Sequence, residues 1–204
     1  MAWVAGFDVA QGGRRGDRIG AAVARPAGRG AVLDAVRVYT PPFSPSAVIA
    51  EVAGWFKTYG ITEVHGDRVA EGFVVQDFKM HGLTYRPCAL DRSQLYLELL
   101  ALVNSGRVRL LDHPELLREL RGLERRRGGQ GRDRVDHRRG NHDDLANAVA
   151  TALVLAAGRS RNELYTGLSA GEFAALVPSS IPTGDVPAPP PLVLPPGGVY
   201  WPGG

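Results

Sequence analysis

Two adjacent aspartates, Asp143 and Asp144, begin the segment NHDDLANAVATALVLAA, whose apolar residues recur at helical spacing. Aspartate is favoured in the first turn of a helix, where its charge meets the positive end of the helix dipole. The pair alone therefore predicts either a capped helix or a site that uses carboxylates. Two further aspartates, Asp8 and Asp67, lie in or directly after segments typical of strands, and we expect them to reach the same region.

These aspartates predict a metal site. Asp8 lies between the apolar residues Phe7 and Val9, where an ionised carboxylate is costly unless it is paired or binds a cation. Clustered carboxylates repel one another, and with no lysine expected nearby we expect bound cations to compensate them. Oxygen ligands without cysteine select Mg²⁺ or Mn²⁺. Two such ions about 4 Å apart can activate a water and stabilise the leaving oxygen of a phosphodiester displacement.

A helical projection separates the two neighbouring aspartates. The apolar face of the predicted helix consists of Leu145, Val149, Ala152, Leu153 and Ala156. Asp144 lies about 100° from the centre of that face, whereas Asp143 lies nearly opposite it. We expect Asp144 to point towards Asp8, and Asp143 to be an outer metal ligand, a water-mediated contact or a cap. His142 is a candidate for orienting water, contacting phosphate, capping the helix or supporting the aspartates from behind.

A second cluster is basic. The segment ERRRGGQGRDRVDHRRG (residues 124–140, the arginine arm) contains Arg125, Arg126, Arg127, Arg132, Arg134, Arg138 and Arg139. A GC-rich genome would favour arginine throughout, and Lys57 and Lys79 are the only lysines, but such a bias does not explain clustering. Guanidinium groups suit phosphate oxygens. The arm predicts either a DNA-binding surface or a solvated hairpin with ion pairs to Asp133 and Asp136.

Composition limits the remaining possibilities. A chain of 204 residues with 44% hydrophobic content can bury one substantial core. No apolar run approaches the roughly 20 residues of a membrane span, and no signal peptide is evident, so we expect no membrane partner. Cys88 is the only cysteine, which excludes an internal disulfide framework and favours a reducing compartment. We expect one domain over residues 1–158 and a largely disordered Pro/Gly-rich extension over 159–204.

The order of predicted elements indicates an α/β fold. Strands are expected at 3–10, 19–25, 31–39, 61–65, 83–90 and 107–111, and helices at 45–60, 71–80, 91–106, 114–123 and from 143 onwards. The first three strands are joined by short turns, which favours an antiparallel meander. The later alternation of strands and helices indicates a mixed sheet with helices on both faces.

Four segments resemble the C-terminal nuclease domain of the large terminase subunit of tailed bacteriophages, which has a ribonuclease H-like fold. They are AGFDVAQGG in the first strand, HGDR around Asp67, SQLYLELLALVNSGRVRLLDHPELLRELRGLERR from Ser93, and VDHRRGNHDDLANAVA from Val135. The resemblance covers roughly residues 2–157. It implies that Asp8, Asp67 and Asp144 are metal-binding catalytic acids and that Asp143 is the adjacent acid of the HDD motif.

The same resemblance implies cutting of concatemeric double-stranded DNA during genome packaging, in the cytoplasm of a bacterial host. It implies the packaging ATPase domain, the small terminase subunit and the portal as partners. A packaging ATPase needs a phosphate-binding loop of the form G-x-x-x-x-G-K-[ST]. Neither Lys57 nor Lys79 follows a glycine, so the chain lacks that loop. We therefore expect an excised nuclease domain or a separately encoded or truncated one.

Two other functions fit the same residues. A Holliday-junction resolvase or a transposase-like strand transferase of the same fold would use the same acids on branched DNA or transposon ends. A non-catalytic DNA-binding or assembly module would use the arginines for phosphate and keep the acids as structural groups. Cleavage of linear against four-way DNA, and its dependence on metal, separates these alternatives.

Overall fold

The computed structural model of the chain describes residues 2–9, 18–67, 72–127, 133–138 and 141–166. The elements are β1 (Val4–Asp8), β2 (Ile19–Ala27), β3 (Gly30–Tyr39), α1 (Pro45–Thr58), β4 (Glu63–Gly66), α2 (Phe73–Met80), β5 (Thr84–Pro87), α3 (Arg92–Asn104), β6 (Val108–Arg109), α4 (Pro114–Arg121), β7 (Leu123–Arg127), β8 (Asp133–His137) and α5 (Asp144–Thr166). The chain divides into two units, Met1–Leu164 and Tyr165–Gly204. Most of the predicted extension, residues 167–204, lies outside the described part.

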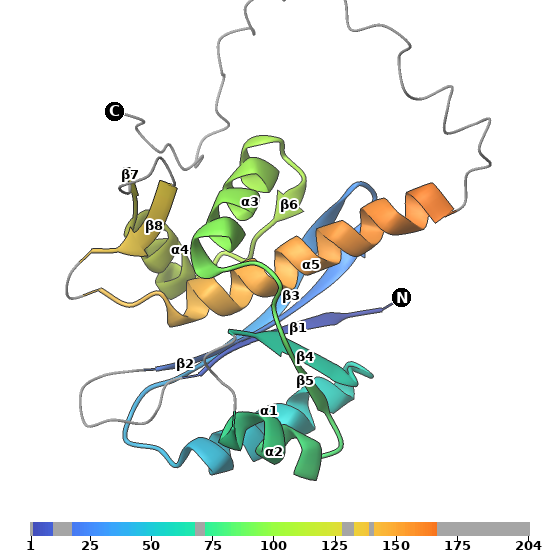
Figure 1. Ribbon diagram of the computed structural model, residues 1–204, viewed down its shortest axis with the longest axis vertical. Helices are drawn as coiled ribbons and strands as arrows, with labels where there is room; N and C mark the ends of the chain where they lie inside the picture. Colours follow the sequence, from blue (N-terminus) through green and yellow to red (C-terminus); the bar gives the residue numbers. More distant parts are fainter. Residues whose placement is uncertain (1, 10–17, 68–71, 128–132, 139–140, 167–204) are drawn as a thin grey trace, which may run out of the picture. The chain divides into compact units, whose positions relative to one another are not determined.

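Six strands form a mixed sheet in the order β5-β4-β1-β2-β3-β6. β1, β2 and β3 are antiparallel neighbours, whereas β4 runs parallel to β1, β5 parallel to β4, and β6 parallel to β3. Helices α1 and α2 lie on one side of this sheet, and α3, α4 and α5 lie on the other (Figure 1). The predicted α/β class, the meander and the helices on both faces are confirmed.

The core on one side joins β1 and β2 to helices α1 and α2. Along a strand, alternate side chains point to opposite faces, and Ala5 and Phe7 of β1 point to this side. The Phe7 ring packs edge-on against Phe78 of α2, with ring centroids 5.0 Å apart. The main helix residues in this core are Val48, Ile49, Val52, Ala53, Phe56, Val74 and Phe78. Because Phe7 faces this core, Gly6 and Asp8 face α5.

Two glycines of the sheet allow α5 to approach at backbone distance. A Cβ atom on Gly6 would lie 2.0 Å from the carbonyl oxygen of Ala148, and one on Gly20 would lie 2.3 Å from the carbonyl oxygen of Asp144. Gly20 of β2 is also the antiparallel partner of Asp8 in β1. One register pair therefore sets both the position of Asp8 and the height of the α5 N-terminus above it.

Several predicted boundaries were wrong. Asp8 is the last residue of β1, not a mid-strand residue, and β6 contains only Val108 and Arg109. Helix α4 ends at Arg121 because the chain turns at Gly122 into a hairpin of β7 and β8. No helix in the described part of the chain is both long and apolar enough to cross a membrane.

Gly20→Ala is expected to destabilise the protein. Its added methyl group would meet the backbone of α5, and overpacking of this kind costs about 1–3 kcal/mol. Gly54→Ala in α1 is the matched control, because a Cβ there meets nothing within 4 Å. Alanine at that helical position should instead raise the free energy of unfolding by up to about 1 kcal/mol. Urea unfolding measures both free energies, and a Gly20→Ala variant as stable as the parent would contradict the close packing.

Candidate active site

The sheet brings Asp8, Asp67 and Asp144 to one edge. Phe7 and Gly66 are the last paired residues of the parallel strands β1 and β4, and Asp8 and Asp67 follow them directly. Asp144 is the first residue of α5, and its backbone lies over Gly20, the partner of Asp8. Acids from three elements that are far apart in the sequence thus come together where the strands end.

Asp8 is the most deeply placed of these acids. Its exposed fraction is 5%, and burial raises the pKa of its carboxyl to about 7. The charge of Arg92 and a hydrogen bond from Asn147 of α5 lower that pKa, while the charges of Asp144 and Asp143 raise it further. Burial and the neighbouring acids outweigh the two stabilising contacts, so the ionised form of Asp8 lacks full compensation from the protein.

Asp143 is buried, contrary to the helical projection. Helix α5 begins at Asp144, so Asp143 is a flanking residue whose carbonyl accepts a hydrogen bond from the backbone N–H of Asn147 at 2.8 Å. Its side chain is therefore not placed by helical geometry, and its exposed fraction is 3%. The Tyr96 hydroxyl donates to it at 2.9 Å. The prediction that Asp143 faces away from the buried side was wrong.

Arg92 lies among the acids. Its Nη1 is 3.4 Å from Oδ2 of Asp143, and its Nη2 is 3.8 Å from Oδ2 of Asp67. Burial lowers the pKa of Arg92, but the charges of Asp143, Asp8 and Asp67, together with Tyr96, outweigh burial and raise it. The sequence predicted bound cations as the compensating charge and did not indicate that this guanidinium supplies part of it.

An open cavity adjoins Arg92 and Asp67. Its volume is about 350 Å³, and its other lining residues are Ala89, Leu90, Asp91 and Gln94. Asp91 and Gln94 form a capping box at the start of α3, which fixes the backbone at Arg92. The carbonyl oxygen of Asp67 accepts a hydrogen bond from the Tyr85 hydroxyl at 2.9 Å. The cavity therefore opens on Asp67, one of the acids, and on Arg92, which faces them.

His142 contacts Asp144 directly, and Glu119 caps the helix that carries it. His142 places Nδ1 3.7 Å from Oδ2 of Asp144. Glu119 of α4 is buried and accepts a hydrogen bond from the backbone N–H of Ala146 at 2.8 Å, capping the helix that carries Asp144. Arg18 lies 3.9 Å from Glu119. Burial raises the pKa of Glu119 to about 7, and the charge of Asp144 adds to this effect.

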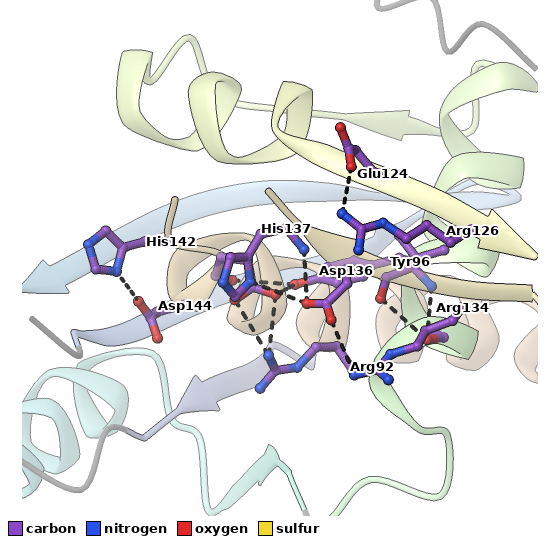
Figure 2. Close-up of polar contacts among 12 residues, drawn as sticks. Arg92, Tyr96, Glu124, Arg126, Arg134, Asp136, His137, His142 and Asp144 are labelled. Atoms are coloured by element: carbon purple, nitrogen blue, oxygen red, sulfur yellow. Dashed lines mark hydrogen bonds and ion pairs between the residues drawn. The ribbon is translucent and has the colours of Figure 1, made fainter. Parts of the chain in front are cut away.

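Asp136 and His137 of β8 extend the cluster. Nδ1 of His137 lies 3.1 Å from Asp143 and 3.4 Å from Asp136. These three side chains could offer ligand atoms to one metal ion. Figure 2 shows Arg92, Tyr96, Asp136 and His137 gathered in one polar cluster, with His142 and Asp144 at its edge. The hairpin therefore contributes side chains to the acid site itself.

The arginine arm forms the antiparallel hairpin of β7 and β8. Arg126 and Arg138 both pair with Glu124, at 2.9 and 2.5 Å, and Arg134 pairs with Asp136 at 3.2 Å. The predicted ion pair to Asp136 is thus present, the two pairs to Glu124 were not predicted, and the side chain of Asp133 lies outside the described residues. Exposed ion pairs of this kind contribute little to stability, so they leave the guanidinium groups able to exchange partners. Arg132, Arg139 and the side chain of Arg127 lie outside the described residues.

Sequence patterns missed the residues that support the acids. Arg92 and Tyr96 are 51 and 47 positions from Asp143, so no local spacing links them. One signal was present: Arg92 occupies the first turn of α3, where a positive charge opposes the helix dipole. A cation at that position does not stabilise the helix.

Several solved structures with a similar fold are phage large terminases or their nuclease domains. The large terminase nuclease from thermophilic phage G20c matches with a TM-score of 0.62 and 21% sequence identity, over 74% of this chain and 80% of that chain. This chain has the fold of a large terminase nuclease domain. The HK97 bacteriophage large terminase matches with a TM-score of 0.61 and 17% identity, over 75% of this chain and 39% of that chain.

Metals are bound in some of these terminase structures. The G20c nuclease with bound magnesium matches with a TM-score of 0.61 and 21% identity, over 74% of this chain and 79% of that chain. A mutant nuclease domain from the large terminase of bacterial virus Sf6, with manganese and beta-thujaplicinol, matches with a TM-score of 0.56 and 13% sequence identity. The match covers 77% of this chain and 88% of that chain. No protein-family model and no curated protein matches this sequence. The likeness to terminase nucleases is therefore one of fold.

Glu119→Gln should flatten the pH dependence of stability in the metal-free protein. The pKa of Glu119 is raised in the folded state to about 7, from 4.5. The contribution of Glu119 to the free energy of unfolding is therefore fully present below about pH 4.5 and is lost as pH rises through about 7. Between about pH 5 and pH 8 the free energy of unfolding of the parent should fall by about 2 kcal/mol more than that of the variant. Thermal unfolding in EDTA measures this, with exposed Glu98→Gln as the control; parallel curves for all three proteins would refute it.

Proposed function

We propose that this chain is a metal-dependent DNA endonuclease of the large terminase type, which cuts concatemeric double-stranded DNA during phage genome packaging. The supporting observation is the convergence of Asp8, Asp67 and Asp144 at one sheet edge in a fold shared with terminase nucleases. The converging carboxylates can bind metal ions, and the fold is that of nuclease domains. Neither a fold nor a carboxylate pair alone would support the proposal.

The described donor set fits divalent cations. Its acids offer only oxygen atoms, which suits Mg²⁺ or Mn²⁺. Asp8 supports this choice, because its buried carboxylate is incompletely compensated by the protein. The G20c nuclease structure with magnesium and the Sf6 structure with manganese support the same two ions here. When bound, two such ions supply a nucleophile at neutral pH and stabilise charge on the leaving oxygen.

The residues of the chain have distinct roles in this proposal. Asp8, Asp67 and Asp144 would hold the two ions. Asp8 lies between the other two along the sheet, because β1 lies between β4, which Asp67 follows, and β2, over which Asp144 lies. Asp143 is a fourth metal ligand whose carboxylate is oriented by Tyr96. His142 contacts Asp144 and supports it from behind. No protein nucleophile is required.

The β7–β8 hairpin is the proposed DNA surface. Arg125, Arg126, Arg127, Arg132, Arg134, Arg138 and Arg139 of the arginine arm would contact phosphates, and the hairpin already reaches the acid cluster through Asp136 and His137. Binding there would place the backbone of a duplex beside the carboxylates. The other proposed partners are a packaging ATPase domain, the small terminase subunit and the portal, in the cytoplasm of a bacterial host.

Plasmid cleavage tests the catalytic proposal. The parent chain should nick or linearise DNA with Mg²⁺ or Mn²⁺ and not with EDTA. Asp8→Asn, Asp67→Asn and Asp144→Asn should each lower the rate at least about a hundredfold, the upper end of the cost of removing a group that supports a metal ligand. Exposed Asp112→Asn is the matched control. Uncut DNA with either metal, or normal cutting by all three variants, would refute nuclease activity, and a preference for four-way junctions would support a resolvase instead.

DNA binding by the hairpin has its own test. A triple variant, Arg126→Gln, Arg134→Gln and Arg138→Gln, should bind duplex DNA more weakly in EDTA. The dependence of log affinity on log salt should become shallower by roughly 0.9 for each phosphate that the variant no longer neutralises. Arg86→Gln is the control, since Arg86 pairs with Glu63 on the strands instead. An unchanged salt slope in the triple variant would place the DNA surface elsewhere.

A further inference from the structure

Arg92 has a position that helix stability does not explain. It is the first residue of α3, where a positive charge meets the positive end of the helix dipole. Asp91 and Gln94 already cap the helix, so its N-terminus does not require a contact from the Arg92 side chain. The side chain instead reaches two separate elements of the site, the end of β4 and the start of α5.

The two ends of the guanidinium face different acids. Nη1 lies 3.4 Å from Asp143, and Nη2 lies 3.8 Å from Asp67. Asp8 also acts on Arg92 by charge. One cation therefore holds together acids from three elements that would otherwise repel one another.

We propose that Arg92 is a positioning residue that serves as the internal counter-ion of the acid cluster and competes with divalent cations for it. The proposal rests on the metal-dependent function above. Both kinds of cation are attracted to the same carboxylates, so metal binding must displace or weaken the contacts of Arg92. In return, the guanidinium keeps the acids together while no metal is bound.

The surroundings of Arg92 give it a place to move. Its side chain is 38% exposed, whereas that of Asp143 is 5% exposed. Arg92 lines the open cavity together with Asp67 and Gln94. A guanidinium that leaves Asp143 can therefore enter solvent at this cavity without crossing the protein core. Lysine at this position would keep the charge but could not face two acids with a planar fork.

Metal titration of the full chain tests the competition. By isothermal calorimetry with MnCl₂, Arg92→Gln should bind Mn²⁺ about tenfold or more tightly than the parent, since removing a neighbouring opposite charge changes cation affinity of a carboxylate by that order. Arg92→Lys should fall between them. Arg86→Gln, which removes an exposed arginine paired with Glu63, should match the parent.

Thermal unfolding supplies the second readout. In EDTA, Arg92→Gln should melt below the parent and Arg92→Lys close to it, and saturating Mn²⁺ should raise the melting temperature of Arg92→Gln most. Equal or weaker Mn²⁺ binding by a folded Arg92→Gln variant would overturn the counter-ion role. If Arg92→Gln does not fold, Arg92→Lys with unchanged Mn²⁺ affinity would overturn it. A parent that binds Mn²⁺ but fails to cut DNA would instead refute the proposed nuclease function.

Discussion

The candidate site depends on how closely α5 approaches the sheet. Gly6 and Gly20 present no side chain to the helix, and the backbone of Ala148 and Asp144 occupies the space that a Cβ would need. Helix and sheet packed through ordinary side chains would stand several ångströms further apart, and Asp144 would lie too far from Asp8 to share a cation. The acid cluster is therefore a consequence of backbone packing, with the carboxylates carried to fixed positions.

This packing concentrates negative charge, and the neighbouring groups compensate it by protonation, hydrogen bonds and an ion pair. Asp8 is buried and its pKa is raised to about 7. Asp143 is held by Tyr96 and Arg92, and Glu119 stays beneath the α5 N-terminus with a pKa raised to about 7. We infer that Arg92 supplies this compensation before metals bind, and that divalent cations supply it afterwards.

The features that could be predicted from the sequence are those that local residue patterns determine, namely the strands, the helices and the fold class. Alternating apolar residues and short turns placed Asp8 in the first strand and Asp67 at a strand end, and the α/β class followed from the order of elements. Asp8 was expected in the middle of its strand, and the structure places it at the end. The projection failed for Asp143 because it assumed that the helix began one residue earlier. The roles of Arg92 and Gly20 come from contacts across many residues, which a sequence taken alone does not specify.

A crystal structure of the chain grown with Mn²⁺ is the sharpest test of the acid cluster as a metal site, because anomalous scattering locates the ions. We predict manganese between the carboxylates of Asp8, Asp67 and Asp144, and an Arg92 side chain turned from Asp143 towards the adjoining cavity. Manganese confined to Asp136 and His137, or absent while Arg92 keeps its contacts with Asp143 and Asp67, would contradict a metal site of this kind.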